Sequence, residues 1–329
     1  MIDKYLSKKY LSRACFYTCV FLLGVGSEWY VNNIKNVSSV SRGPIRADLS
    51  QYQFINPLLY SDRKKSDDAP YKTLASSLQI YIASVKNSSM SQSISVYFRD
   101  MNVGRWTGVD EDKLYKTSSM LKVLAMMSVL KLAEHDPGVL SQKMLFRRSY
   151  HSKDYLKEDK NLSYDSYSIQ ELISVMIKNS NNDAFRTLVS DPRINNEFLD
   201  LYMMFRLPHE GLIDPSLDYM SPHSYSAIFR ILYNSSLFPW GLSEKVLELL
   251  SETTFTCGIV AGVPSDIKVS HKFGENTNEL HDCGIVYYPQ RPYLLCVMTK
   301  GKSISDLSGI IANISKIAWT FMKTTYPTN

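Results

Sequence analysis

Strand-forming segments lie at both ends of the central part of this chain, and helical segments lie between them. Alternation and β-branched or aromatic residues mark the strands, and a turn at Asn102-Val103-Gly104 joins the first two. This order predicts an α+β fold, with an antiparallel sheet interrupted by an inserted helical lobe. The predicted strands cover residues 93–99, 105–109, 267–272, 283–288 and 293–299.

The helical segments are recognised by apolar residues at helical spacing. The last of them is the clearest, since one apolar stripe runs along its whole length. A cleft between the sheet and the helical lobe is a usual place for a functional site. The predicted helices cover residues 71–86, 118–136, 168–178, 221–233 and 303–322.

The composition is that of an ordinary globular protein, with 44% hydrophobic and 21% charged residues among 329. The net charge of +5 is unevenly spread, because the first 13 residues already carry a net charge of +3. The rest of the chain has no basic stripe of the kind that binds a nucleic-acid backbone. We therefore expect no nucleic-acid partner.

An uncharged and mostly apolar run follows those basic residues, from Ala14 to Ser27. A basic flank before an apolar segment is typical of an export signal whose positive end stays in the cytoplasm. Extended to Val31, the run approaches the roughly 20 residues that span a bilayer. We expect a single-pass signal anchor over residues 1–31, a spacer over 32–70 and an extracytoplasmic domain. The alternatives are a cleaved signal peptide, giving a secreted or periplasmic protein, and a buried core helix.

The five cysteines do not form a disulfide framework. Cys15 and Cys19 lie in the apolar run, which leaves Cys257, Cys283 and Cys296. No Cys-x-x-Cys pair occurs, so neither a zinc site nor a redox motif is indicated, and we expect no metal or cofactor. We interpret the three as small buried hydrophobic residues, with one bridge among them in an oxidising compartment as the alternative.

Ser119 and Lys122 form the first candidate catalytic pair. Three residues apart on a helix, they share one face, so the amine lies beside the hydroxyl. Such an amine can remove the hydroxyl proton and activate a weak nucleophile. Lys122 lies in the apolar run 120–127, and burial favours the neutral amine that a base requires. The alternative is an N-cap serine beside a solvated lysine.

Ser180-Asn181-Asn182 is the second candidate motif, at a break between two helical segments. Its functional interpretation is a second hydroxyl that relays a proton, together with an amide that binds a substrate carbonyl. The alternative is helix capping, because Ser and Asn are good N-caps.

Lys272-Phe273-Gly274 is the third motif, at the end of a predicted strand. Lys272 could hold the relay serine and a substrate carboxylate, and Gly274 would let a ligand backbone approach closely. The alternative is an edge-strand lysine that discourages aggregation.

In this order the three motifs resemble those of the serine β-lactamase and penicillin-binding protein superfamily, whose signatures are S-x-x-K, S-D-N and K-T-G. The chain is most similar to the class A β-lactamase-like branch, over residues 71–322. Residues 269–275 and 281–288 support the resemblance, as does Met220-Ser221-Pro222 at the start of a helix. The resemblance implies a β-lactamase/transpeptidase-like α+β fold, with an antiparallel sheet flanked by helices and an inserted all-α lobe at about 117–255.

The resemblance also implies catalytic roles. Ser119 would be the acylated nucleophile and Lys122 its activating base. Ser180 would relay the proton, and Lys272 would be the electrostatic anchor.

Three residues would bind the substrate, again by resemblance. Asn182 would contact the substrate amide, and Gly274 would lie beside the ligand. The oxyanion hole would consist of the backbone amides of Ser119 and Glu275.

Departures from the family pattern concern the same sites. Asn181 replaces the middle aspartate of the second motif, and Phe273 replaces the hydroxyl residue of the third, which removes a usual contact to a substrate carboxylate. No Glu-x-x-x-Asn segment precedes Ser221, although such a glutamate activates water for deacylation. Acidic residues in that region without the pattern are Glu210, Asp214 and Asp218.

The leading hypothesis is therefore a serine hydrolase that opens β-lactams through an acyl-Ser119 intermediate, with slow deacylation. One alternative is a D-alanyl-D-alanine carboxypeptidase acting on peptidoglycan stem peptides. The other is a non-catalytic protein that binds the cell wall. We expect a monomer attached to the membrane by its N-terminal segment.

Overall fold

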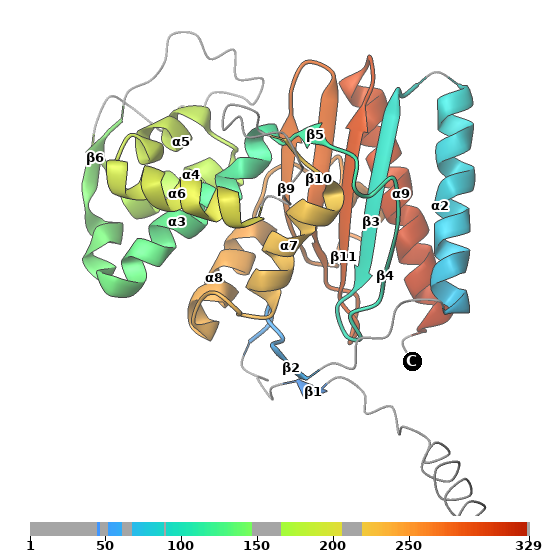
Figure 1. Ribbon diagram of the computed structural model, residues 1–329, viewed down its shortest axis with the longest axis horizontal. Coiled ribbons are helices and arrows are strands. Elements are labelled where there is room, and N and C mark those ends of the chain that lie inside the picture. Colours follow the sequence, from blue (N-terminus) through green and yellow to red (C-terminus); the bar gives the residue numbers. More distant parts are fainter. Residues whose placement is uncertain are drawn as a thin grey trace, which may run out of the picture. The chain divides into compact units, whose positions relative to one another are not determined.

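Five antiparallel strands form the main sheet, in the order β4-β3-β11-β10-β9. The computed structural model describes residues 45–46, 52–60, 68–88, 90–146, 166–205 and 219–327. Two strands precede the helical segments in the sequence and three follow them, as predicted (Figure 1). The strands are β3 (Ser93–Asp100), β4 (Trp106–Val109), β9 (Val269–Glu275), β10 (Glu279–Val286) and β11 (Tyr293–Lys300).

Strands β9 and β10 are displaced from their predicted bounds. β9 continues through Glu275, so the whole Lys-Phe-Gly motif lies inside a strand. β10 begins at Glu279, four residues before the predicted start at Cys283, and pairs with both neighbours along its length. The pairing extends these strands because each added residue gains ladder hydrogen bonds that local sequence preference does not reveal.

Helices cover both faces of the sheet. α2 (Ala69–Asn87) and α9 (Ile304–Thr325) pack on one face, and α7 (Pro222–Tyr233) with α8 (Trp240–Ser251) pack on the other (Figure 1). The sheet is thus the middle of three layers, which is the layered arrangement expected of an α+β domain.

The hydrophobic core is divided in two by the sheet. Successive strand residues point to opposite faces, so Cys296 and Met298 of β11 join the cluster on the α7 side, whereas Leu295 and Val297 join the cluster on the α9 side. Burial of both faces explains why this strand is an almost continuous apolar run.

A lobe of four helices lies beside the sheet (Figure 1). α3 forms its centre, and every residue from Val123 to Leu130 is buried. A helix without an exposed face is typical of a domain core. The lobe helices are α3 (Lys122–His135), α4 (Ile169–Lys178), α5 (Asn182–Val189) and α6 (Pro192–Phe205).

Short elements complete the described fold. β5 pairs with β8, which links the chain just before Ser119 to the start of α7. β1 pairs with β2, and β6 with β7. Their bounds are β1 (Ile45–Arg46), β2 (Leu58–Tyr60), β5 (Tyr115–Lys116), β6 (Lys143–Leu145), β7 (Ser166–Ser168), β8 (Tyr219–Met220), η1 (Ser118–Leu121), η2 (Pro137–Ser141) and η3 (Ile259–Gly262).

Part of the predicted spacer packs on this fold. The carboxylate of Glu244 in α8 accepts hydrogen bonds from the backbone N–H groups of residues 53–55, at 2.5 to 3.0 Å. Phe54 is buried and meets the Tyr287 ring edge-on, with 5.2 Å between the ring centroids. Residues 53–55 are therefore attached to the folded domain by both charge-assisted hydrogen bonds and apolar contact.

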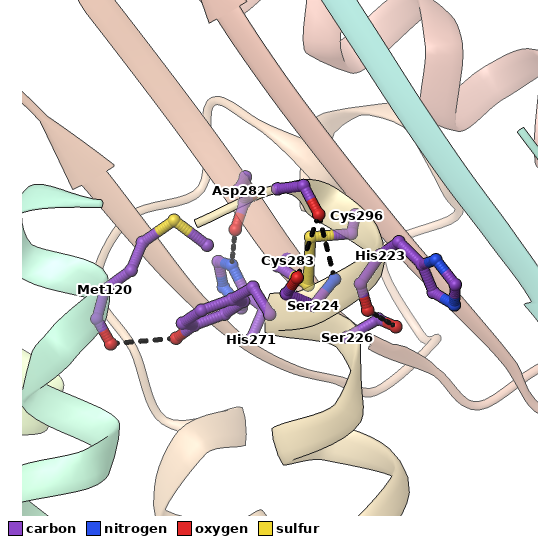
Figure 2. The surroundings of a disulfide bond; sticks show 10 residues. Met120, His223, Ser224, Ser226, His271, Asp282, Cys283 and Cys296 are labelled. Carbon is purple, nitrogen blue, oxygen red and sulfur yellow. Dashed lines mark hydrogen bonds and ion pairs between the residues drawn. A yellow bond between two sulfur atoms is a disulfide. The ribbon is translucent and has the colours of Figure 1, made fainter. Parts of the chain in front are cut away.

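Two of the cysteines form a disulfide. Cys283 and Cys296 are register partners on β10 and β11 with Cα atoms 4.0 Å apart, which is the bridge that the sequence left as an alternative (Figure 2). Cys257 is free and exposed rather than buried. Figure 2 also shows His271 beside Asp282, a fully buried pair with 2.8 Å between Nδ1 and Oδ1.

The predicted signal anchor over residues 1–31 lies outside the described residues. Among the helices that the structure does describe, none has the length and apolar character needed to cross a membrane. The acidic residues Glu210, Asp214 and Asp218 also lie outside the described residues.

Candidate active site

Ser119 lies in the 3₁₀ turn η1, which leads directly into α3. Its predecessor, Ser118, has φ 53°, a left-handed conformation that is uncommon for residues other than glycine. The Tyr225 hydroxyl of α7 donates a hydrogen bond to the carbonyl of Met120 at 2.8 Å, which attaches the turn to α7. Ser119 itself is partly exposed at the N-terminal end of α3, where helix amides favour negative charge.

Lys122 is 2% exposed and lies beside Ser119, as predicted. Its Nζ is 3.0 Å from Ser119 Oγ, 2.5 Å from the Ser180 carbonyl oxygen and 2.6 Å from Asn182 Oδ1. A neutral amine has two N–H donors and one lone pair, and the two amide oxygens can only accept. In its neutral form, Lys122 would engage these oxygens through its N–H groups and keep its lone pair for a hydroxyl such as that of Ser119. This arrangement prepares Lys122 to act as a base.

Ser180 lies between two amines. Its Oγ is 3.2 Å from Nζ of Lys122 and 2.9 Å from Nζ of Lys272, and the residue is 6% exposed. Its φ is 55°, a left-handed conformation in which its carbonyl oxygen also reaches Lys122. A hydroxyl can accept one proton and donate another, so this position suits a proton relay.

The capping interpretation of the second motif holds for its middle residue. Asn181 is the N-cap of α5, and its Oδ1 accepts a hydrogen bond from the Ala184 N–H at 2.8 Å. Asn182 has a different role, since its side-chain oxygen accepts from Lys122. Its predicted contact with a substrate amide stays a prediction, and the structure adds a contact of 2.6 Å with Lys122 Nζ.

Lys272 is fully buried although β9 is an edge strand. Its Nζ donates to Ser180 Oγ at 2.9 Å and to the Phe273 carbonyl oxygen at 3.1 Å. Burial lowers the pKa of Lys272 well below its usual value, and the like charge of Lys122 lowers it further, against the opposing effect of Asp282. Lys272 is thus directed into the site rather than solvated at the sheet edge.

Gly274 permits close packing of β9 on the nucleophile turn. A Cβ at this position would lie 2.5 Å from the Thr117 carbonyl oxygen and 2.7 Å from Cγ of Met120, so no side chain fits. Next in the strand, Glu275 is exposed, and partial burial of its carboxyl raises its pKa. The contact between β9 and η1 supports the oxyanion-hole assignment of the Ser119 and Glu275 amides, which stays a prediction.

Asn276 supports the nucleophile turn from the other side and was not identified from the sequence. Its Nδ2 donates to Ser118 Oγ at 3.3 Å and to Glu279 Oε2 at 2.9 Å. Glu279 is itself paired with Lys300, at 3.3 Å. No motif marks this chain of contacts, because it depends on the register of three strands.

His281 supports the chain just before Ser119. The Thr299 N–H donates to its Nδ1 at 3.2 Å, which leaves Nε2 to donate to the Lys116 carbonyl oxygen at 3.1 Å. Burial lowers the pKa of His281 to about 4, so the ring is neutral, as these two hydrogen bonds require. The histidine lies in the segment that carries the family resemblance, but its partners are fixed only by β10–β11 pairing.

Within the described ranges, no cluster of three or more histidine, cysteine, aspartate or glutamate side chains is arranged to hold a metal ion. The described site is instead built on two amines and two hydroxyls. The residues predicted to be catalytic, together with Asn182, form one connected hydrogen-bond network: Ser119, Lys122, Ser180, Lys272 and Asn182.

The comparisons with known protein sequences agree on one family. A sequence model described as the beta-lactamase enzyme family matches residues 75–322, about three quarters of the chain. A β-lactamase of Streptomyces albus G is 25% identical over 252 residues, which cover 68% of this chain and 78% of that protein.

Solved structures share the fold at lower identity. A class A β-lactamase from Mycobacterium abscessus has a TM-score of 0.61 and 19% identity, covering 75% of this chain and 98% of its own. An acyl-enzyme complex of a PBP-A mutant with penicillin G has a TM-score of 0.64 and 17% identity, covering 81% and 100%. At these identities the likeness establishes the α+β fold with its five-stranded antiparallel sheet.

Proposed function

This chain belongs to the beta-lactamase enzyme family, and from that premise we propose that it is a serine hydrolase that opens β-lactams through an acyl-Ser119 intermediate. One observation carries the proposal. Lys122 reaches Ser119 Oγ at 3.0 Å while two acceptor-only oxygens hold its N–H groups. That geometry gives an unreactive hydroxyl the base it needs.

Acylation follows from the contacts around Ser180. As Ser119 Oγ attacks the carbonyl carbon, its proton passes to Nζ of Lys122. The C–N bond then breaks, and the leaving nitrogen takes the proton of Ser180 Oγ. Lys122, 3.2 Å from that oxygen, returns its proton to Ser180. No proton is gained or lost, and both Lys122 and Ser180 regain their starting states.

Deacylation is proposed to be slow. Water must add to the acyl carbonyl to release the product acid and restore the Ser119 hydroxyl, and this step needs a base that positions the water. Among the described residues, no carboxylate is hydrogen-bonded to Ser119. The nearest sequence match to the usual deacylation segment is Glu210 followed by Asp214, with aspartate in place of asparagine.

The test is the intact mass of the protein after mixing with benzylpenicillin. The wild type should gain the mass of one penicillin and keep it for minutes or longer, and Ser119→Ala should gain none. Ser84→Ala is the control, because it removes an exposed serine hydroxyl in α2 and leaves the Ser119 turn untouched. A wild type that gains no mass while it remains folded would refute the proposal.

Turnover of a chromogenic cephalosporin then measures deacylation. The expected result is a stoichiometric burst followed by slow release. Glu210→Gln should change the slow phase by less than about threefold, since a missing general base would cost about 10²–10⁴-fold. A large loss in this variant would make Glu210 the base and the protein an efficient β-lactamase.

A second candidate is a D-alanyl-D-alanine carboxypeptidase that uses the same residues. The lack of a Glu-x-x-x-Asn segment favours it, because an acyl-enzyme that resists water resembles an inhibited peptidase rather than an antibiotic-destroying enzyme. Release of D-alanine from a pentapeptide, absent in Ser119→Ala, would support this activity. Binding to peptidoglycan without any labelling of Ser119 would instead indicate a non-catalytic wall-binding protein.

We further propose that the catalytic domain is extracytoplasmic and held by the N-terminal apolar segment. The basic flank before Ala14–Ser27 supports this orientation, and a Cys283–Cys296 disulfide is typical of an oxidising compartment. Protease treatment of cells stripped of wall and any outer membrane should degrade the domain while the membrane fraction keeps the N-terminal segment. A soluble cytoplasmic protein with reduced cysteines would contradict the proposal.

A further inference from the structure

The side of the site that receives the leaving group can be located from the proposed proton transfer. The leaving nitrogen takes its proton from Ser180 Oγ, so its substituents lie next to that hydroxyl. Lys272 Nζ is 2.9 Å from the same oxygen, and Phe273 follows in the strand. The chemistry of Lys272, Phe273 and their neighbours therefore determines which leaving groups fit.

Lys272 is not available to a substrate carboxylate. Its exposed fraction is 0%, and its N–H groups donate to Ser180 Oγ and to the Phe273 carbonyl oxygen. The Phe273 ring lies over the amine, with 4.1 Å between Nζ and the ring centroid. Because burial also favours the neutral amine, this lysine offers a substrate anion neither an accessible donor nor a dependable charge.

An aromatic pair occupies the position beside this lysine. Phe273 stacks on Phe255 of the loop after α8, with 4.2 Å between ring centroids and 19° between planes. The hydroxyls of the same loop are already engaged: Thr253 Oγ1 donates to the His271 carbonyl oxygen at 3.1 Å, and Thr254 Oγ1 donates to the Lys178 carbonyl oxygen at 3.0 Å. Phe273 and this part of the loop therefore offer no free side-chain donor for an anion.

The exposed charge further along β9 is negative. Side chains alternate along a strand, so Glu275 points to the same face of β9 as Phe273, and the residue is exposed although its carboxyl is partly buried. Among the described strands β9 and β10, Lys272 is the sole lysine or arginine. A carboxylate placed here would meet repulsion, and the described strands β9 and β10 offer it no accessible cation.

We propose that the leaving-group side of this site selects amides whose leaving nitrogen carries no carboxylate. The substrate class is thus a neutral acyl-transfer substrate, in which an uncharged group replaces the acid that penicillins and D-alanyl-D-alanine peptides carry next to the scissile amide. Phe273, Phe255 and Glu275 are the specificity-determining residues. The inference rests on the proposed acylation of Ser119.

The test compares benzylpenicillin with its carboxamide, which keeps the ring and removes the charge. The rate of mass gain at Ser119 is measured for each compound and divided by that compound's alkaline hydrolysis rate, which corrects for intrinsic reactivity. In the wild type, the carboxamide should acylate Ser119 at least as fast as the acid. A corrected rate more than about tenfold faster for the acid would overturn the inference. A difference of that size is what one charge-assisted hydrogen bond to the carboxylate would contribute.

Two variants assign the effect to residues. Glu275→Gln removes the repulsion without changing shape, and it should shift the preference towards the acid by about threefold. Phe273→Thr supplies a hydroxyl and uncovers Lys272, and it should shift the preference by about tenfold or more. Phe273→Leu is the matched control for the hydroxyl and should produce a smaller shift than Phe273→Thr.

The outcomes separate this inference from the proposed function. Acylation by both compounds with a strong preference for the acid would keep the serine hydrolase and reject the neutral leaving group. An unchanged preference in both Glu275→Gln and Phe273→Thr would also reject it. If Phe273→Thr does not fold, Glu275→Gln alone decides, since its side chain is exposed. Acylation by neither compound in the wild type would reject both proposals.

Discussion

Lys122 and Lys272 reach the same hydroxyl from opposite sides of the site, and their surroundings differ. On the helical side, Lys122 is held by the Ser180 carbonyl and the Asn182 amide. On the sheet side, Lys272 is enclosed by an aromatic ring and fully buried. Acceptors around an amine direct its lone pair, whereas an apolar cover removes it from solvent. The helical side therefore suits proton transfer and the sheet side suits selection of the leaving group.

This difference shows that a motif can keep its lysine while the surroundings of that lysine change. The first two motifs retain every polar atom that proton transfer requires. In the third, the replacement of a hydroxyl residue by Phe273 leaves the lysine in place but covers it. Motifs that match one family can thus keep the groups for proton transfer on one side of a site and lose a substrate contact on the other.

The largest effect is expected from removing the base on the helical side. Lys122→Met should reduce acylation of Ser119 by benzylpenicillin by about 10³-fold or more, because the hydroxyl then has no proton acceptor. Time-resolved intact mass measures this rate. Lys131→Met, in the same helix, is the control and should acylate normally. A loss below tenfold would assign the base to Lys272 and reverse the comparison.

A smaller kinetic loss is expected on the sheet side. Lys272→Met should slow acylation by about 10–100-fold, since it removes a hydrogen bond to Ser180 rather than the base. Lys268→Met is the matched control, because Lys268 is exposed just before β9.

The same variant changes stability in a direction fixed by the lowered pKa of Lys272. Between its folded value and about 10.5 the unfolded chain binds more protons, so wild-type stability rises with pH. Lys272→Met should remove that slope and be more stable than wild type at pH 7. Urea unfolding at several pH values measures it. An equal pH dependence of stability between pH 7 and 9 in Lys272→Met and the wild type would show that the protonation of Lys272 does not change on unfolding.

His281 tests the support of the nucleophile turn by the sheet. Its pKa is lowered to about 4, so the unfolded chain takes up a proton between pH 6.5 and 4 while the folded one does not. Stability should fall over this window by at most about 3 kcal/mol. Urea unfolding should show a shallower fall in His281→Gln, and an unchanged one in His135→Gln, whose site is exposed. Equal acid sensitivity in all three proteins would contradict the assignment.

The smallest effect is expected at the Glu244 contact with residues 53–55. Glu244→Gln weakens charge-assisted hydrogen bonds to the backbone and should lower the free energy of unfolding by about 1–2 kcal/mol. Acylation of Ser119 should stay within about twofold of the wild type, since neither lysine is touched. Glu248→Gln in the same helix is the control. A large loss of acylation would show that this segment also positions the site.

The sequence predicted the helical side of the site better than the sheet side. Ser119 and Lys122 are one turn apart, so local geometry alone places them together. Asn276, His281 and Phe255 lie in strands or loops whose partners depend on pairing register and loop packing. Periodicity does not contain that register, since β10 begins four residues before its predicted start. The Glu244 contact joins segments about 190 positions apart, and no local pattern indicates it.

By itself the amino-acid sequence determined the order of strands and helices, the three polar motifs and the placement of Lys122 beside Ser119. These features are local, because hydrophobic periodicity and helical spacing act over a few residues. Only the tertiary structure decided that Lys272 lies under an aromatic ring, that Glu275 is exposed further along the strand and that the neutral His281 supports the chain before Ser119. Strand register and packing bring residues together that are distant in the sequence. The protonation and exposure of each side chain then depend on these tertiary neighbours, which local sequence patterns do not reveal.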